Sequence, residues 1–120
     1  MSLKIGKKTT RKSKIEAVEP LDYENSTTHT FDVELEVIPK SRWDKMFQSD
    51  QKPSDTDILK TTLKNLEGLV DDNGQPVKFD DDVKLKVLDE PWVAAALIEE
   101  QISIQQGKTG SEYRRLKLKN

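Results

Sequence analysis

An alternation of apolar and acidic side chains constrains the fold of this chain more than any other feature of its sequence. Every second position is apolar and the positions between are acidic: Phe31, Val33, Leu35 and Val37 alternate with Asp32, Glu34 and Glu36. A period of two is typical of an antiparallel strand with one face in a core and the other in water. Pro39 has no N–H for a sheet ladder, so the predicted strand covers residues Thr28 to Ile38.

A single strand cannot bury its apolar face alone, so this segment needs a partner. Three sources stay open, namely the N-terminal segment, a later hairpin, or another subunit, which leaves a homo-oligomer as one alternative. Ile15, Ala17 and Val18 predict a short edge strand, whereas residues 19–26 have the composition of a loop. We therefore expect residues 1–27 to be a flexible basic arm and loop, residues 28–107 a single α+β domain, and residues 108–120 a basic flexible tail.

Two helices are predicted between residues 41 and 68. Trp43, Met46 and Phe47 fall at i, i+3 and i+4, which places an aromatic stripe on one side of a short helix over residues 41–48. This stripe is either core or a docking surface for apolar segments. The second helix begins at Ser54, because residues 54–57 fit an S-x-x-D capping pattern. One apolar face of this helix is formed by Ile58, Leu59, Leu63 and Leu66, and the helix ends at Gly68.

The second half of the chain begins with a predicted β-hairpin over residues 69–77. Asn73-Gly74 supplies the two positive-φ residues of a type I′ turn. Residues 79–88 fit a helix and a strand equally well, since Asp80 is a suitable N-cap but residues 83–87 alternate. The last helix begins near Pro91 and ends before Gly107. The predicted fold class is α+β, with a small N-terminal antiparallel β element and a short β-hairpin packed with three to four helices.

The residue types that catalysis and metal binding need are scarce. The chain has no Cys and a single histidine, His29, so neither a transition-metal site nor a histidine-based triad is expected. The acidic run from Asp71 to Asp82 fails as a calcium loop, because its sixth position is Pro76 where that loop needs Gly. We therefore expect no enzymatic activity, no cofactor and no bound metal.

Charge is distributed unevenly along the chain. Residues 1–14 hold six basic groups and no acid, residues 108–120 hold five basic groups and one acid, and the 93 residues between hold 9 basic and 21 acidic groups. Such an acidic body argues against a nucleic-acid partner, because phosphate contacts need clustered Lys and Arg on the folded surface. No apolar run approaches the roughly 20 residues that span a bilayer, and no secretory signal is present. We expect no membrane association and a location inside the cell that makes the protein.

The order of motifs from residue 59 onward resembles that of bacteriophage tail assembly chaperones. A leucine-bearing helix over residues 59–66 is followed by the turn Asp71-Asp72-Asn73-Gly74-Gln75-Pro76-Val77-Lys78-Phe79. Then come the acids at 80–82, Glu90-Pro91-Trp92-Val93, Ala94-Ala95-Ala96, Gly107 and the closing Lys119-Asn120. The strand and the short aromatic helix before them are also similar, so the resemblance covers residues 28–120.

The resemblance implies a function without chemistry. Such chaperones coat the long apolar tape-measure protein, help recruit tail-tube subunits and then leave. The resemblance therefore implies the host bacterial cytoplasm and absence from the mature virion, and it favours a helix over residues 81–88. The candidate partner contacts, all of which also fit a core, are Trp43, Met46, Phe47, Trp92 and Leu97. The main alternative is a structural tail-completion or adaptor protein that stays in the virion, and a further one is a nucleic-acid regulator that uses the basic termini.

Overall fold

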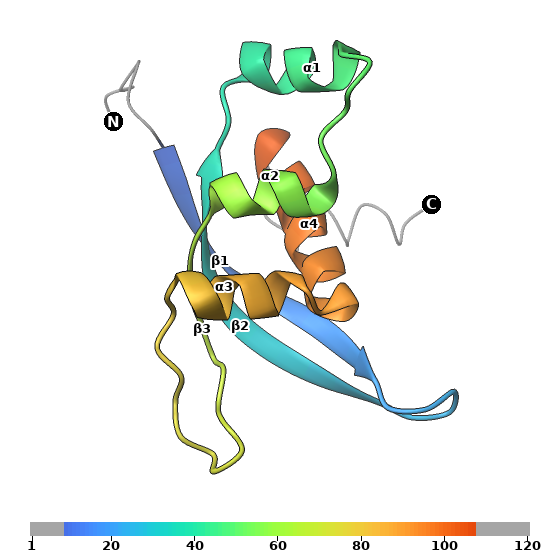
Figure 1. Cartoon of the computed structure of the whole chain (residues 1–120), viewed down its shortest axis with the longest axis vertical. Coiled ribbons are helices and arrows are strands. Elements are labelled where there is room, and N and C mark those ends of the chain that lie inside the picture. Colours follow the sequence, from blue (N-terminus) through green and yellow to red (C-terminus); the bar gives the residue numbers. More distant parts are fainter. Residues whose placement is uncertain (1–8, 108–120) are drawn as a thin grey trace.

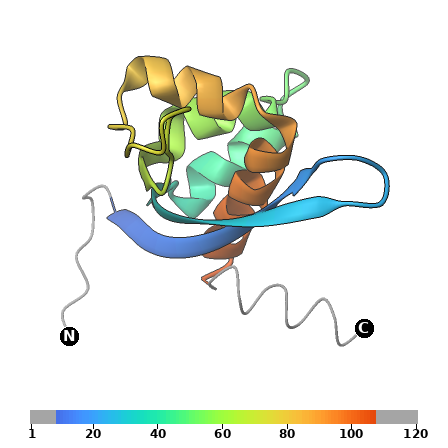
Figure 2. The ribbon, with the colours of Figure 1, turned by 90° about the horizontal axis from the view of Figure 1, so that it is seen from below.

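The computed structural model describes residues 9–107 and confirms the α+β fold (Figure 1). Three antiparallel strands, β1 (Thr9–Pro20), β2 (Ser26–Val37) and β3 (Leu63–Glu67), form a sheet of order β1-β2-β3. Four helices accompany them: α1 (Lys40–Gln48), α2 (Asp55–Thr62), α3 (Asp81–Leu88) and α4 (Pro91–Gln105). In Figure 2 the helices gather on one side of the curved β1–β2 ribbon. The acidic and basic side chains of the opposite face are therefore left outside the core.

The central strand β2 pairs along its whole length with β1. Ile15 lies opposite Phe31 and Ala17 opposite His29, and both β1 residues are buried. The predicted flexible arm over residues 1–27 is therefore wrong for residues 9–20, which form a strand far longer than the short edge strand expected there. Residues 9–20 form a strand because β2 needs a partner strand. The segment joined to β2 by a short turn can pair with it at little cost in loop entropy. Residues 1–8 and the predicted tail over residues 108–120 lie outside the described residues.

The alternation that predicted β2 is confirmed on one face and only partly on the other. Phe31, Val33 and Leu35 are buried, as expected. Glu36 on the acidic face is only 6% exposed, however, at the end of β2 where its backbone carbonyl accepts a hydrogen bond from Gln101. The end of β2 is thus enclosed, whereas Asp32 near its middle is exposed.

The helix predicted from Ser54 to Gly68 is in fact a helix followed by a strand. The capping box is confirmed, since Ser54 Oγ accepts from Asp57 N at 3.1 Å and Asp57 Oδ2 accepts from Ser54 N at 3.4 Å. Helix α2 ends at Thr62, and β3 follows with a bulge that sets Leu63 opposite Leu35 and Leu66 opposite Val33. The bulge inserts one extra residue, so both leucines face the core at a spacing of three, which imitates a helical repeat.

A short hairpin follows β3, held by a bridge between Val70 and Pro76. Gly74 N donates to the carbonyl of Asp71 at 2.9 Å. Gly74 has φ of 77°, and within residues 9–107 no residue other than glycine has positive φ. The predicted type I′ turn is therefore wrong, because it needs two positive-φ residues. The loop is instead a three-residue connection with Gly74 in the left-handed position. Asp71 Oδ1 accepts from Asn73 N and Gln75 N, which fixes the turn from inside.

The segment that fitted a helix and a strand equally well is the helix α3, and the last predicted helix is α4. Asp80 caps α3 through a 2.8 Å bond from Val83 N, and Pro91 is the first residue of α4. The core lies between these helices, α2 and the sheet, and it is mainly aliphatic. Its buried members are Ile15, Ala17, Phe31, Val33, Leu35, Leu59, Leu63, Leu66, Val87, Leu88, Val93, Leu97 and Ile104. Phe31 is the one aromatic residue among these buried members.

Candidate protein-binding surface

Helix α1 is the least enclosed element of the described chain. None of its residues is buried, and Figure 1 shows it beyond α2, far from the tip of the β1–β2 hairpin. The first turn has no side-chain cap, and Trp43 N donates to the carbonyl of Pro39 at 2.9 Å. The helix is thus held by its two connections and by little core packing.

The aromatic stripe predicted on α1 is present. The rings of Trp43 and Phe47 lie 4.9 Å apart at an angle of 60°, a tilted pair that stabilises both side chains. Trp43 and Met46 are half-buried, and Phe47 is 38% exposed. These three side chains therefore form a single apolar surface, which we name the α1 stripe, and large apolar groups left at a surface are typical of binding sites.

The other two predicted contact residues lie elsewhere. Trp92, at the start of α4, packs its ring 5.2 Å from that of His29 and 6.4 Å from that of Phe31. It is half-buried at the rim of the core and is separate from the α1 stripe. Leu97 is 0% exposed, so it is a core residue, and its proposed role as a partner contact does not fit its position. The sequence could not separate these cases, because all of them are apolar positions on helices.

A pair of glutamines on α4 contributes an interaction that the sequence analysis missed. Strand β3 begins opposite Leu35, so within residues 9–107 no strand lies beside the backbone of Ile38 on that side of β2. The side-chain amide of Gln105 takes the place of a neighbouring strand. Its Oε1 accepts from Ile38 N and its Nε2 donates to Ile38 O, both at 2.8 Å. Gln101 Nε2 donates to the carbonyl of Glu36 at 3.0 Å and to Gln105 Oε1 at 2.9 Å. We name this pair the glutamine clamp.

The glutamine clamp positions the α1 stripe. Ile38 is the last residue before Pro39, from which α1 begins, so the clamp fixes the point where the chain leaves the sheet. The signal in the sequence was present but weak, since two glutamines at i and i+4 on one helix face read as an exposed polar pair. Only the three-dimensional position of Ile38 shows that they satisfy buried backbone groups.

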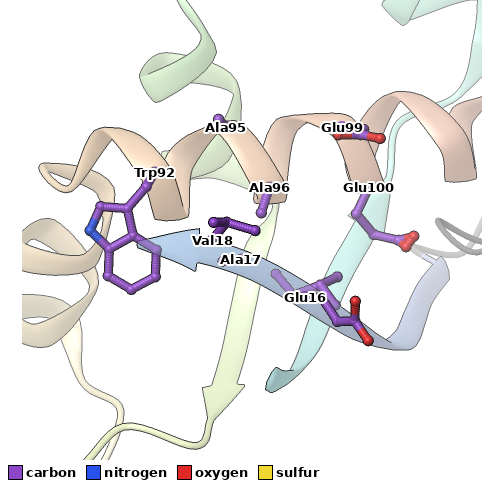
Figure 3. A pocket seen from close by; sticks show the side chains of 9 residues that line it. Glu16, Ala17, Val18, Trp92, Ala95, Ala96, Glu99 and Glu100 are labelled. Carbon is purple, nitrogen blue, oxygen red and sulfur yellow. The ribbon is translucent and has the colours of Figure 1, made fainter. Parts of the chain in front are cut away.

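A groove runs between β1 and α4, with a cavity volume of about 350 Å³. It is lined by four consecutive β1 residues, Ile15 to Val18, and by one side of α4 (Figure 3). Trp92 closes one end of this β1–α4 groove, and the glutamates Glu16, Glu99 and Glu100 gather at the other, as Figure 3 shows. Glu100 is only 2% exposed, so Glu16 and the half-buried Glu99 supply the acidic part of the exposed wall.

The side chains of His29 and Asp71 make local contacts in the described part of the chain. His29 Nε2 lies 2.9 Å from Glu19 Oε1 across the β1–β2 ladder, which joins two half-exposed side chains near the hairpin turn. The carboxylate of Asp71 is occupied by the turn that it caps. Within residues 9–107, no group of three or more His, Asp or Glu side chains is arranged to hold a metal ion.

Comparison of the chain with protein-family models, with curated proteins and with solved structures gave no match. None of the helices within residues 9–107 has both the length and the apolar character that crossing a bilayer requires.

Proposed function

We propose that this protein is a phage tail assembly chaperone that binds the apolar tape-measure protein through the α1 stripe and helps recruit tail-tube subunits, without catalysis. The observation that carries the proposal is that α1 presents Trp43, Met46 and Phe47 together while burying none of its residues. The order of sequence motifs supports it from a separate direction, because it resembles that of tail assembly chaperones.

The physical case for the α1 stripe rests on what its exposure costs. Fully burying a large apolar side chain is worth about 1.5–3 kcal/mol, so the half-buried Trp43 and Met46 and the exposed Phe47 each forgo part of that stabilisation. A partner with an apolar helical face would recover that energy on binding. Methionine adds tolerance, because its flexible side chain fits irregular partner surfaces. The contact is small, so a complex with one copy is weak and reversible, which suits a chaperone that must leave.

The charge of the body suits the same function. A long apolar protein aggregates through its exposed stripes, and covering them with an acidic protein gives the complex a repulsive surface. Glu34 and Asp32 on the outer face of β2 and Asp80 to Asp82 at the start of α3 contribute to this negative surface. We further propose that the protein acts in the host bacterial cytoplasm and is absent from the finished virion.

The test is co-expression with the tape-measure protein encoded beside this chain. We expect the tape-measure protein to be soluble and to co-purify only when this chain is present. Trp43→Ala and Phe47→Ala should each abolish that rescue, while Arg42→Ala and Lys45→Ala, which change exposed positions on the same helix, should preserve it. Urea unfolding midpoints should stay close to that of the wild type for Arg42→Ala and Lys45→Ala. They should fall only slightly for Trp43→Ala and Phe47→Ala, because α1 buries none of its residues and these two side chains mainly contact each other.

Two results would contradict the proposal. One is a tape-measure protein that is equally insoluble with and without this chain. The other is mass-spectrometric detection of this chain in purified particles at a stoichiometric level, which would favour a structural tail-completion or adaptor protein.

A further inference from the structure

The outer edge of β1 is a long stretch of strand with no strand beside it. β1 has 12 residues and stands at the end of the sheet, because β2 pairs with it on its inner side only. Within residues 9–107, no other segment forms a backbone hydrogen bond with this outer edge. Proteins usually cover or block such an edge, since its unpaired N–H and C=O groups are a template for another strand.

The charges of β1 divide into two halves of opposite sign. Arg11, Lys12 and Lys14 occupy the first half, and Glu16 and Glu19 occupy the second. All are exposed except Glu19, which is half-exposed. Charged side chains protect an edge strand when pairing with a second copy would set like charges opposite each other. A strand that is positive at one end and negative at the other attracts a second copy in antiparallel orientation.

One antiparallel register matches these charges. With a two-fold axis at Ile15, Lys14 of each copy lies opposite Glu16 of the other, and Arg11 lies opposite Glu19. Residues directly opposite in an antiparallel pair lie on the same face, so these charges meet. Shifting the register by one pair in either direction sets Lys14 opposite Lys14 or Glu16 opposite Glu16. The favoured register therefore forms four opposite-charge pairs and avoids like-charge pairs.

The β1–α4 groove provides room for the second strand. Its floor is β1 itself, and the small side chains Ala95 and Ala96 on α4 leave space beside the edge (Figure 3). In the favoured register, the segment of the second copy that lies against residues 15–18 is its basic half, residues 12–15. Glu16 lies at that place on the exposed face of β1, where it meets Lys14 of the second copy.

We propose that two copies of this protein associate through their β1 edges, in antiparallel register about Ile15, to form a continuous six-stranded sheet. The interface is isologous, as a two-fold axis requires. It uses neither Trp43 nor Phe47, so it is independent of the proposed chaperone function and leaves the α1 stripe of both copies exposed. Each dimer would then present two such stripes to a long partner.

A charge-exchange experiment tests the proposal on the full chain. Sedimentation equilibrium should show a concentration-dependent dimer for the wild type. Lys14→Glu and Glu16→Lys should each weaken the dimer by about tenfold or more, because each sets two like-charge pairs in the sheet. The double variant carrying both changes should recover the affinity of the wild type. Lys45→Glu on α1 is the matched control for a change in net charge, and it should leave the dimer unchanged.

A cross-linking experiment tests the register. The native chain has no cysteine, and Lys12 and Val18 lie opposite each other only between copies. Within one strand they are six residues apart, about 20 Å, which no disulfide spans. Oxidation of the Lys12→Cys, Val18→Cys double variant should therefore give a covalent dimer, and neither single variant should. A monomer at every concentration, a double charge variant that stays weak, or cross-linking of a single cysteine variant would overturn the proposal.

Discussion

Replacing Gln105 by leucine removes half of the glutamine clamp at nearly constant side-chain volume. The native amide accepts from Ile38 N and donates to Ile38 O, both at 2.8 Å, and Ile38 is only 2% exposed. Leucine can make neither bond, and water has little access to the two backbone groups left behind. We therefore expect Gln105→Leu to destabilise the fold although leucine is a good helix former and an apolar residue.

The magnitude follows from the two backbone groups. A buried donor or acceptor that loses its partner costs about 1–3 kcal/mol, and the extra apolar contact of leucine offsets about 1 kcal/mol of the sum. The expected loss in the free energy of unfolding is thus about 1–5 kcal/mol. A chain of this length is stable by roughly 6–18 kcal/mol, so the variant still folds. The melting temperature should fall by about 5–25 °C.

Urea denaturation followed by tryptophan fluorescence measures the loss, with Gln106→Leu as the matched control. Gln106 is exposed and forms no side-chain hydrogen bond within residues 9–107, so its replacement should change stability by less than about 0.5 kcal/mol. Amide exchange at Ile38 should also become faster in the Gln105 variant only. If the two variants unfold at the same urea concentration, the glutamine clamp contributes nothing and the reasoning fails.

Three further predictions follow from individual contacts. Ser54→Ala should cost about 1 kcal/mol in urea unfolding by removing the cap of α2, and an unchanged midpoint would contradict this. Gly68→Ala should destabilise the fold about 1–3 kcal/mol more than Gly74→Ala. Both glycines have positive φ, but only at Gly68 would an added Cβ meet a backbone oxygen, at 2.9 Å. Equal melting temperatures of the two variants would refute this prediction. The side chain of Asn25 and, next in size, the N–H of Glu24 hold the pKa of Asp22 below its usual range. The ionised carboxyl therefore stabilises the β1–β2 turn at pH values above its unfolded pKa. This contribution is lost as the pH falls through the lower pKa of the folded state. NMR titration of Asp22 should show that lowered pKa, and Asn25→Ala should raise it toward the usual value.

Much of the fold was predictable because local patterns agreed with tertiary structure. The alternation in β2, the capping box at Ser54 and the N-cap at Asp80 each report a preference that the fold satisfies. The predictions failed where a long-range contact determined the secondary structure. β1 is a strand because β2 needs a neighbour, and Leu63 and Leu66 share a face because of a bulge that no spacing rule distinguishes from a helical turn.

The candidate site was predictable in type and only partly in position. The stripe of Trp43, Met46 and Phe47 was expected as either core or surface, and its periodicity is the same in both cases. Only the absence of buried residues on α1 assigns it to the surface. Leu97 has the same helical periodicity, yet it lies in the core. The face of α4 that carries Leu97 packs into the body, whereas no face of α1 does.

The division of apolar residues between core and surface bears on the proposed function more than any single contact. The chain has seven aromatic residues, and among those described only Phe31 is buried, while Tyr23 is 97% exposed and Phe47 is 38% exposed. Aliphatic side chains therefore supply most of the folding energy. Aromatic side chains are the residues that dominate binding energy at protein interfaces, since they combine large area with few rotatable bonds. Phe79 and Trp92 pack partly buried against the core, so among the described residues Trp43 and Phe47 are the aromatic pair left for the contact that the proposed function requires.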